Sequence, residues 1–205
     1  MRLPRPLLIV LARQLGHPRG VLGRVLATGL NRRNRGMTRA AVEALDLRPD
    51  ETAADLGFGG GLGLRLMLGA GATVHGVEIS DTMLARARTT FAGHARLRLH
   101  RGTLTALPLP TASTHAVLTM NTIYFVDDLP AALSEVARVL VPGGRFVLGV
   151  GDPEFMAATA VIGHGTFHLR PLADVEKALA DAGLTVHRRE YVGAETPTHL
   201  FVAGK

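Results

Sequence analysis

The sequence contains no cysteine and no tryptophan, and aromatic residues make up only 4% of it. The lack of cysteine excludes a thiol nucleophile, a zinc site built on thiolates and a disulfide framework. Acidic residues are missing from the first 42 positions, which hold nine arginines, and Glu43 is the first carboxylate. The other 163 residues hold 14 basic and 17 acidic residues, so a basic N-terminal segment precedes a mildly acidic remainder.

The composition also argues against nucleic-acid binding and against a membrane span. A nucleic-acid surface combines basic residues with stacking aromatics or a recognition motif, and this chain has few aromatics. The apolar run from Leu7 to Ala12 is six residues long, far short of the ~20 needed to cross a bilayer. Arginines precede that run as in a signal peptide, but no small-residue cleavage site follows it. We therefore expect a cytoplasmic protein that binds no nucleic acid.

Hydrophobic patterning divides the 205 residues, taken as one domain, into a helical N-terminal segment (1–47) and an α/β core (51–205). Strands are predicted at 52–58, 73–79, 97–102, 116–121, 145–150, 185–192 and 200–203. Helices are predicted at 62–68, 81–91, 129–140 and 172–182. This alternation predicts a doubly wound, mainly parallel sheet with helices on both faces. The last two strands have no helix between them, which predicts an antiparallel hairpin.

The most informative segment is A-A-D-L-G-F-G-G-G-L-G-L-R-L at 53–66, which leaves a predicted strand and enters a predicted helix. Its glycines let the backbone turn sharply and approach a ligand closely. The dinucleotide fingerprint G-x-G-x-x-G is not matched, because its third glycine would fall on a leucine, at 62 or 64. The segment instead has an acid two residues before a glycine ladder of period two, formed by Asp55, Gly57, Gly59 and Gly61.

A second carboxylate follows at the end of the next predicted strand, V-H-G-V-E-I, where Glu78 lies 21 residues after Gly57. A carboxylate at that place can accept hydrogen bonds from both vicinal hydroxyls of a ribose lying across the strand ends. The glycine loop and this acid together predict a nucleoside site.

From Glu51 to Lys205 the sequence resembles the class I S-adenosylmethionine-dependent methyltransferases. The resemblance rests on the acid and glycine ladder at 55–61, on E-I-S-D-T-M-L-A-R-A at 78–87 and on L-S-E-V-A-R-V-L-V-P-G-G-R-F-V-L at 133–148. A final D-A-G-L with two closing strands is similar to the C-terminal hairpin of the family. The resemblance implies a Rossmann-like sheet of seven strands with an antiparallel last strand. It also implies S-adenosylmethionine as cofactor and S-adenosylhomocysteine as product.

Residue roles follow from the same resemblance. The loop residues Asp55, Gly57, Phe58, Gly59 and Gly61 are expected to shape the pocket for the methionine half of the cofactor. Glu78 is expected to bind the ribose, and Asn121 to line the end that carries the methyl group. Around the adenine we expect Ile79, Met83, Thr103 and Leu104. Met83 is equally well interpreted as a core residue, and Thr103 stands where relatives often carry an acid.

The catalytic residues are harder to predict from the sequence than the cofactor site, because this family has no universal catalytic residue. Tyr124 and His164 are the first candidates for a base, followed by His168 and His17. His115 replaces a structural aspartate of the family, and we interpret it as a sequence change without a catalytic role. No acids or histidines have metal-ligand spacing, so we expect no metal. The acceptor is expected to be a small, largely hydrophobic molecule, bounded by 123–125, 155–167 and the N-terminal segment; the methylated atom and the oligomeric state stay open.

The N-terminal segment has leucines and valines at helical spacing on both sides of Pro18, which predicts two short amphipathic helices. We interpret them as a lid over cofactor and acceptor. The alternative is a peripheral contact of residues 1–35 with anionic lipid, which would suit a lipid methyltransferase at the membrane surface. A third possibility is a protein of this fold that binds the cofactor without methylating.

Overall fold

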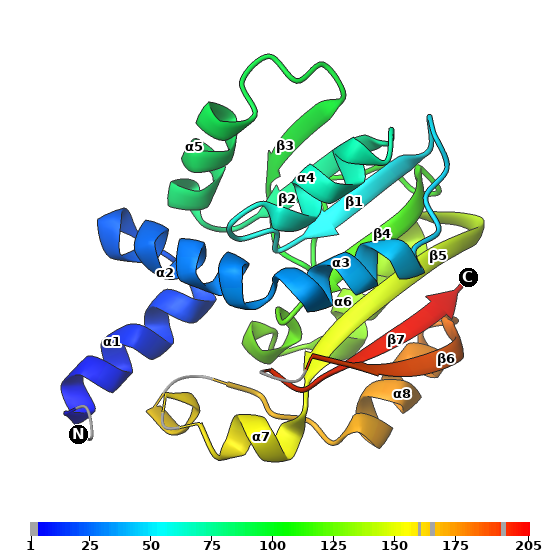
Figure 1. Ribbon diagram of the computed structural model, residues 1–205. Helices are drawn as coiled ribbons and strands as arrows, with labels where there is room; N and C mark the ends of the chain where they lie inside the picture. Colours follow the sequence, from blue (N-terminus) through cyan, green and yellow to red (C-terminus); the bar gives the residue numbers. More distant parts are fainter. Residues whose placement is uncertain (1–3, 160, 165–166, 194–195) are drawn as a thin grey trace.

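Seven strands form one sheet in the order β3-β2-β1-β4-β5-β7-β6 (Figure 1). The computed structural model describes residues 4–159, 161–164, 167–193 and 196–205. β7 runs antiparallel to both β5 and β6, and the other neighbouring strands run parallel. The strands are β1 (Thr52–Leu56), β2 (Thr73–Glu78), β3 (Leu97–Arg101), β4 (Thr114–Met120), β5 (Leu140–Gly151), β6 (Thr185–Val192) and β7 (Thr198–Gly204).

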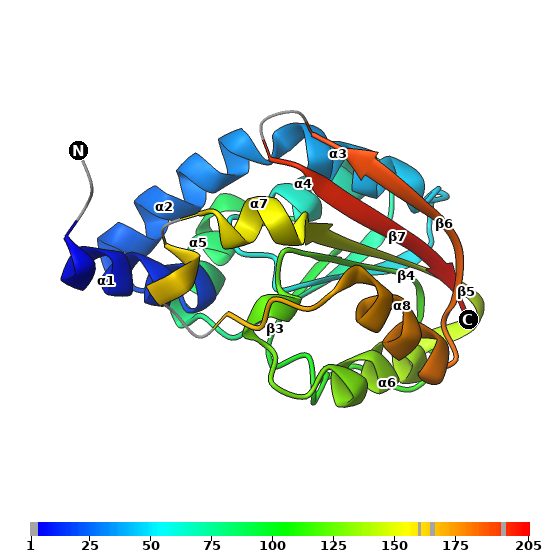
Figure 2. The ribbon, with the colours of Figure 1, turned by 90° about the horizontal axis from the view of Figure 1, so that it is seen from below.

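Helices cover both faces of the sheet, and Figure 2 shows the two helical layers on opposite sides of it. One layer consists of α3 (Arg35–Ala44), α4 (Leu62–Gly69) and α5 (Asp81–Thr90), and the other of α6 (Leu129–Val139) and α8 (Leu172–Asp181). Each layer encloses its own apolar core. Phe146 of β5 and Phe201 of β7 are fully buried, and burial of a side chain of that size stabilises the fold by ~1.5–3 kcal/mol.

The carboxyl ends of the central strands lie at one edge of the sheet. Leu56 of β1 is in register with Val77 of β2 and with Thr119 of β4. The Thr119 hydroxyl donates a hydrogen bond to the Leu56 carbonyl at 2.8 Å. The chain therefore leaves all three strands at the same level, and the loops that follow them lie side by side.

Two further helices, α1 (Arg5–Gly16) and α2 (Gly20–Arg33), lie over this edge of the sheet (Figure 1). The break between them falls at His17, Pro18 and Arg19, where the proline predicts it. Short elements complete the chain after β4 and β5: η1 (Ile123–Phe125), α7 (Pro153–Ala157) and η2 (Ile162–His164). In the part of the chain that the structure describes, no helix combines the length and apolarity needed to cross a bilayer.

The predicted doubly wound sheet with its antiparallel last strand is confirmed, and the differences are local. β5 begins at Leu140, five residues before the predicted start, so the helix before it ends at Val139. The N-terminal segment contains a third helix, α3, which the leucine spacing around Pro18 does not reveal. Helix α7 was also missed; the Asp152 carboxylate caps it by accepting from the N–H groups of Glu154 and Phe155.

Candidate functional site

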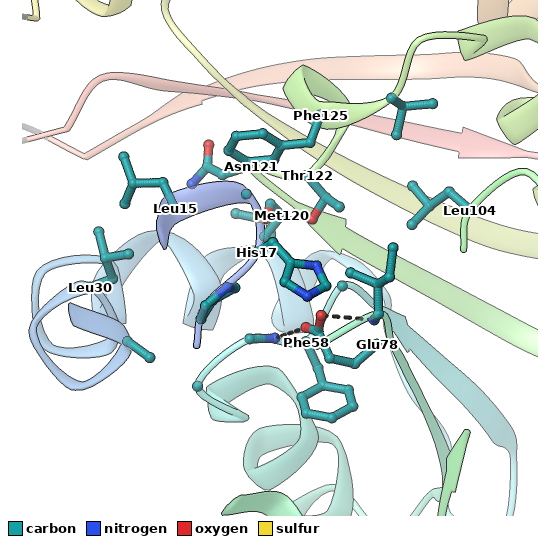
Figure 3. A pocket seen from close by; sticks show the side chains of 18 of the residues that line it. Leu15, His17, Leu30, Phe58, Glu78, Leu104, Met120, Asn121, Thr122 and Phe125 are labelled. Atoms are coloured by element: carbon teal, nitrogen blue, oxygen red, sulfur yellow. Dashed lines mark hydrogen bonds between the residues drawn. The ribbon is translucent and has the colours of Figure 1, made fainter. Parts of the chain in front are cut away.

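A cavity of about 1120 Å³ lies between the N-terminal helices and the carboxyl ends of the central strands (Figure 3). Its walls come from the loops after β1, β2, β3 and β4 and from the inward faces of α1 and α2. Ligand pockets of proteins typically measure ~300–1,000 Å³. The cavity therefore has room for a nucleoside-sized ligand together with a second small molecule.

The glycine loop after β1 forms one wall of this cavity. Gly57 and Gly59 have φ values of 72° and 47°, in the left-handed region that glycine adopts without strain. A Cβ on Gly57 would meet the Thr122 side chain at 2.6 Å. On Gly59 it would have nothing nearer than a carbonyl at 3.9 Å, so it would occupy open space. Gly61 lies beneath Phe91 at the start of α4 and does not line the cavity.

Glu78 ends β2 with its carboxylate buried and turned toward the glycine loop (Figure 3). Its Oε1 accepts hydrogen bonds from the backbone N–H groups of Ile79 and Ser80, each at 2.9 Å. Its Oε2 accepts from the Gly59 N–H, also at 2.9 Å. A carboxylate offers about four acceptor positions, so one position on Oε2 stays available to a ligand. The three backbone bonds fix where that position lies.

Asp55, the second buried carboxylate of the cavity, lies near the end of β1. Burial and the nearby charge of Glu78 raise its pKa from 3.8 to about 7, and the Leu64 N–H opposes that shift. Gly63 of α4 leaves the space that the carboxylate fills, because a Cβ there would overlap Oδ2. Among the described residues no cationic side chain forms an ion pair with Asp55. A positively charged ligand group would meet an uncompensated carboxylate here.

The N-terminal helices are joined to the loops that carry these two acids. The Asn31 amide of α2 donates to the Gly60 carbonyl at 2.9 Å, and the Ser80 hydroxyl donates to the Pro18 carbonyl. His17, between α1 and α2, points its ring into the cavity above Glu78 (Figure 3). The turn between the helices therefore covers the acid that ends β2.

Of the residues predicted to surround the adenine, three line the cavity and one does not. Ile79, Thr103 and Leu104 line the cavity, and Ile79 is partly exposed. The Thr103 hydroxyl lies 3.3 Å from that of Thr105, which also lines the wall. Met83 is fully buried in the core between the sheet and α5 and does not reach the cavity. Its interpretation as a core residue is the one that the structure favours.

Asn121 follows β4 and lies on the cavity wall with Met120 and Thr122. Its φ of 54° is left-handed, a conformation that asparagine tolerates better than most residues. The backbone N–H of Asn121 donates to the Gly149 carbonyl at 2.9 Å, which holds this turn against β5. The three residues form the wall next to the glycine loop, since Thr122 faces Gly57.

Of the two candidate bases, the structure describes the side chain of Tyr124 alone, and Tyr124 does not line the cavity. Tyr124 is buried, and its hydroxyl accepts from the Gly151 N–H and lies 3.4 Å from Asn121 Oδ1. Burial raises the pKa of this phenol well above its usual range, so Tyr124 is unsuited to act as a base. His164 lies in η2, and its side chain lies outside the described residues. His168 binds Asp127 Oδ1 at 2.7 Å.

Several cavity residues were missed by the sequence analysis. They are polar side chains of α2, of α3 and of the residue between them, together with residues after β4: Asn31, Asn34, Thr38, Thr122, Asp127 and Asp128. Asn31 could have been predicted, because it is a polar residue on the otherwise apolar inward side of a helix. The expected wall at 155–167 does not line the cavity in its described positions. His115 lies at the opposite end of β4, where its ring accepts from the Thr52 N–H at 3.2 Å.

Metal ligands do not gather anywhere in the described chain: no group of three or more histidine, aspartate or glutamate side chains could hold an ion there.

Comparison with known proteins finds a family match over part of this chain. Residues 54–148 match the family described as methyltransferase domain. A demethylmenaquinone methyltransferase of Tropheryma whipplei is 37% identical over 112 residues, which cover 54% of this chain and 46% of that protein. The chain spans between a third and about three fifths of the length of the curated relatives it matches.

Two solved structures share the fold across nearly the whole chain. One is a chain from the complex between the Trm112 methyltransferase activator of Haloferax volcanii and a methyltransferase, with a TM-score of 0.81, 22% identity and 96% of both chains covered. The other is an S-adenosylmethionine-dependent methyltransferase of Aquifex aeolicus, with a TM-score of 0.73, 18% identity, and 96% and 97% covered. At these identities the likeness extends to the fold alone.

Proposed function

We propose that this chain is a class I methyltransferase that transfers a methyl group from S-adenosylmethionine to a small, largely apolar acceptor. The match of residues 54–148 to the methyltransferase-domain family and the shared fold support this proposal. The observation that carries the proposal is the pairing of Glu78 with the Gly59 N–H beside open cavity space. This pairing fixes the position of a hydrogen-bond acceptor for a ribose hydroxyl. The acceptor lies next to the Gly59 backbone, where no side chain blocks a ligand.

The residues of the cavity fit this cofactor. Glu78 would accept from one ribose hydroxyl at the open position of Oε2. Gly59 leaves room for the methionine part, and Asp55 offers a buried carboxylate to its positive charge. Ile79 and Leu104 supply apolar surface on the far side of Glu78. When bound, the cofactor supplies a methyl group on a sulfonium, which is already activated for displacement.

The protein then has to align the acceptor and exclude water. Asn121, Thr122 and Phe125 would form the wall on which the acceptor lies, because they adjoin the glycine loop. The ring of His17, between α1 and α2, projects into the cavity. We assign it the role of wall residue and of acceptor for a proton that an acidic substrate would lose.

The acceptor class follows from the character of the walls. Apolar surface is brought to the cavity by Leu15, Leu26 and Leu30 of α1 and α2 and by Phe125 of η1. The Tropheryma whipplei relative is named for demethylmenaquinone methylation. A quinone-like ring is therefore the first acceptor to test, followed by phenols and by acids of similar size.

We also propose that α1 and α2 act as a lid. The support comes from their hydrogen bonds to the glycine loop and to the start of α5 through Asn31, Pro18 and Gly20. Entry of a ligand past Glu78 would require these contacts to open, and their closure would exclude water.

The test is incubation of the full chain with S-adenosylmethionine and each acceptor, followed by mass spectrometry. A mass gain of one methyl group, with formation of S-adenosylhomocysteine, supports methyl transfer. Binding of the cofactor without transfer to any acceptor would support the alternative of a binding protein of this fold.

A further inference from the structure

The outer sides of α1 and α2 expose apolar side chains to an unusual extent. Within the described residues, seven large apolar side chains are exposed, and five of them belong to these two helices. We call these five the outer apolar face: Leu7, Val10, Val21, Leu22 and Val25.

On α2 this face is opposite to the side that packs on the protein. Val21 and Val25 are one helical turn apart and are 76% and 61% exposed, whereas Gly23 and Ala27 are buried. Figures 1 and 2 both show α1 and α2 projecting from the same corner of the body. Exposed apolar groups that gather at one place mark an interaction site, whereas singly scattered ones do not.

The same segment carries positive charge without compensation. Residues 4–42 hold eight arginines and no acid, and each of these arginines is exposed. None of the eight forms an ion pair with another described residue. A partner for this surface has to combine negative charge with a place to bury valine and leucine side chains.

We propose that the outer apolar face docks on the surface of an anionic lipid bilayer. Valine and leucine side chains enter the boundary between headgroups and acyl chains, while the arginines contact the anionic headgroups. A nucleic acid offers the negative charge but no apolar surface for the valines. A second copy of the chain offers apolar surface, but it brings eight further arginines of the same sign, and like charges disfavour such a contact.

This surface reaches the cavity at one residue. Val10 belongs to the outer apolar face and also lines the rim of the cavity. A docked protein would therefore present the cavity rim to the bilayer, where apolar acceptors dissolve. The docking itself stands independently of the proposed methyl transfer, because Val21 and Val25 do not line the cavity.

The experiment is co-sedimentation of the full chain with vesicles of phosphatidylcholine alone and with about one third phosphatidylglycerol. Binding is measured at about 50 mM and about 500 mM salt, since screening weakens contacts with headgroups. We expect binding to the anionic vesicles at low salt and at least tenfold weaker binding to the neutral ones. The double variant Val21→Ser/Val25→Ser should bind the anionic vesicles at least fivefold more weakly.

The matched control is Tyr191→Ser on β6, which removes an apolar side chain that is 63% exposed but lies outside α1 and α2. It should bind vesicles as the unaltered protein does. Thermal melting and calorimetry with S-adenosylhomocysteine show whether each variant is folded and keeps its cofactor site. A folded double variant that binds as tightly as the unaltered protein overturns the assignment. A full chain that does not bind anionic vesicles also overturns the assignment, whether it dimerises through Val21 and Val25 or binds RNA instead.

Discussion

Oε2 of Glu78 accepts a hydrogen bond from the backbone N–H of Gly59 at 2.9 Å, which joins the acid at the end of β2 to the loop at the end of β1. The two features are 19 residues apart in the sequence, and the parallel pairing of β1 with β2 brings them together. The carboxylate holds the loop in the conformation that leaves cavity space beside it. The contact between Glu78 and Gly59 therefore shapes the loop and also directs the remaining lone pair of Glu78 toward a ligand.

The first prediction concerns this carboxylate. Glu78→Gln keeps the size of the side chain but replaces one acceptor oxygen by a donor, so it weakens both the Gly59 contact and the ribose contact. Hydrogen bonds to a charged group are worth about 1.5–3 kcal/mol, so the Kd for S-adenosylhomocysteine should rise about tenfold or more by calorimetry. Asp81→Asn is the control, because Asp81 is exposed and pairs with Arg101 outside the cavity. Equal affinities of a folded Glu78→Gln and the unaltered protein would refute the assignment.

The second prediction is a pH effect of Asp55 on stability. Its pKa is raised from 3.8 to about 7 in the folded protein, so the stability it contributes is greatest below pH 4. That contribution is lost as the pH rises to about 7. Asp55→Asn removes the buried charge, and its free energy of unfolding should exceed that of the unaltered protein at pH 8 by up to roughly 4 kcal/mol.

Urea denaturation at about pH 5 and about pH 8 measures this difference. The gain from Asp55→Asn should shrink toward the lower pH, where the aspartate is itself neutral. An Asp55→Asn variant that is destabilised equally at both values would contradict the raised pKa. The same variant should bind S-adenosylmethionine more weakly at pH 8, because the carboxylate that faces its positive charge is gone.

The third prediction concerns the open space at Gly59. Gly59→Val should abolish cofactor binding, because a branched side chain would project where the ligand has to lie. Valine also resists the positive φ of 47°, so stability has to be controlled separately. Gly143→Val is matched for this strain: Gly143 has a φ of 75°, open surroundings and no place on the cavity wall. Both variants should melt earlier, but Gly143→Val should keep its affinity; a Gly59→Val that still binds would refute the loop assignment.

The fourth prediction tests the lid. Asn31→Ala removes the bond from α2 to the Gly60 carbonyl. A hydrogen bond of this kind contributes ~0.5–1.5 kcal/mol, so S-adenosylhomocysteine should dissociate about two- to tenfold faster in stopped-flow displacement. Thr28→Ala is the control, since Thr28 is exposed on α2 and its hydroxyl bonds within the helix to the Arg24 carbonyl. Identical dissociation rates for the two variants would show that α2 does not hold the ligand in place.

The sequence predicts the sheet well because the signals that specify it are local. Strand and helix periods alternate, and the glycines at 57 and 59 mark a loop whose backbone adopts positive φ. Glu78 could be found from its spacing alone. The side chains that meet across the cavity could not, because Asn31 reaches Gly60 over 29 residues and nothing in the sequence specifies that approach. Met83 and Tyr124 show the same limit: their positions were foreseeable, but the direction of their side chains depends on tertiary packing.

Calorimetric titration of S-adenosylhomocysteine into the full, unaltered chain tests the central claim most directly. We expect one molecule bound per chain with a Kd in the micromolar range, displaced competitively by S-adenosylmethionine. A folded chain that gives no binding heat with either compound, and no change in melting temperature, would contradict it.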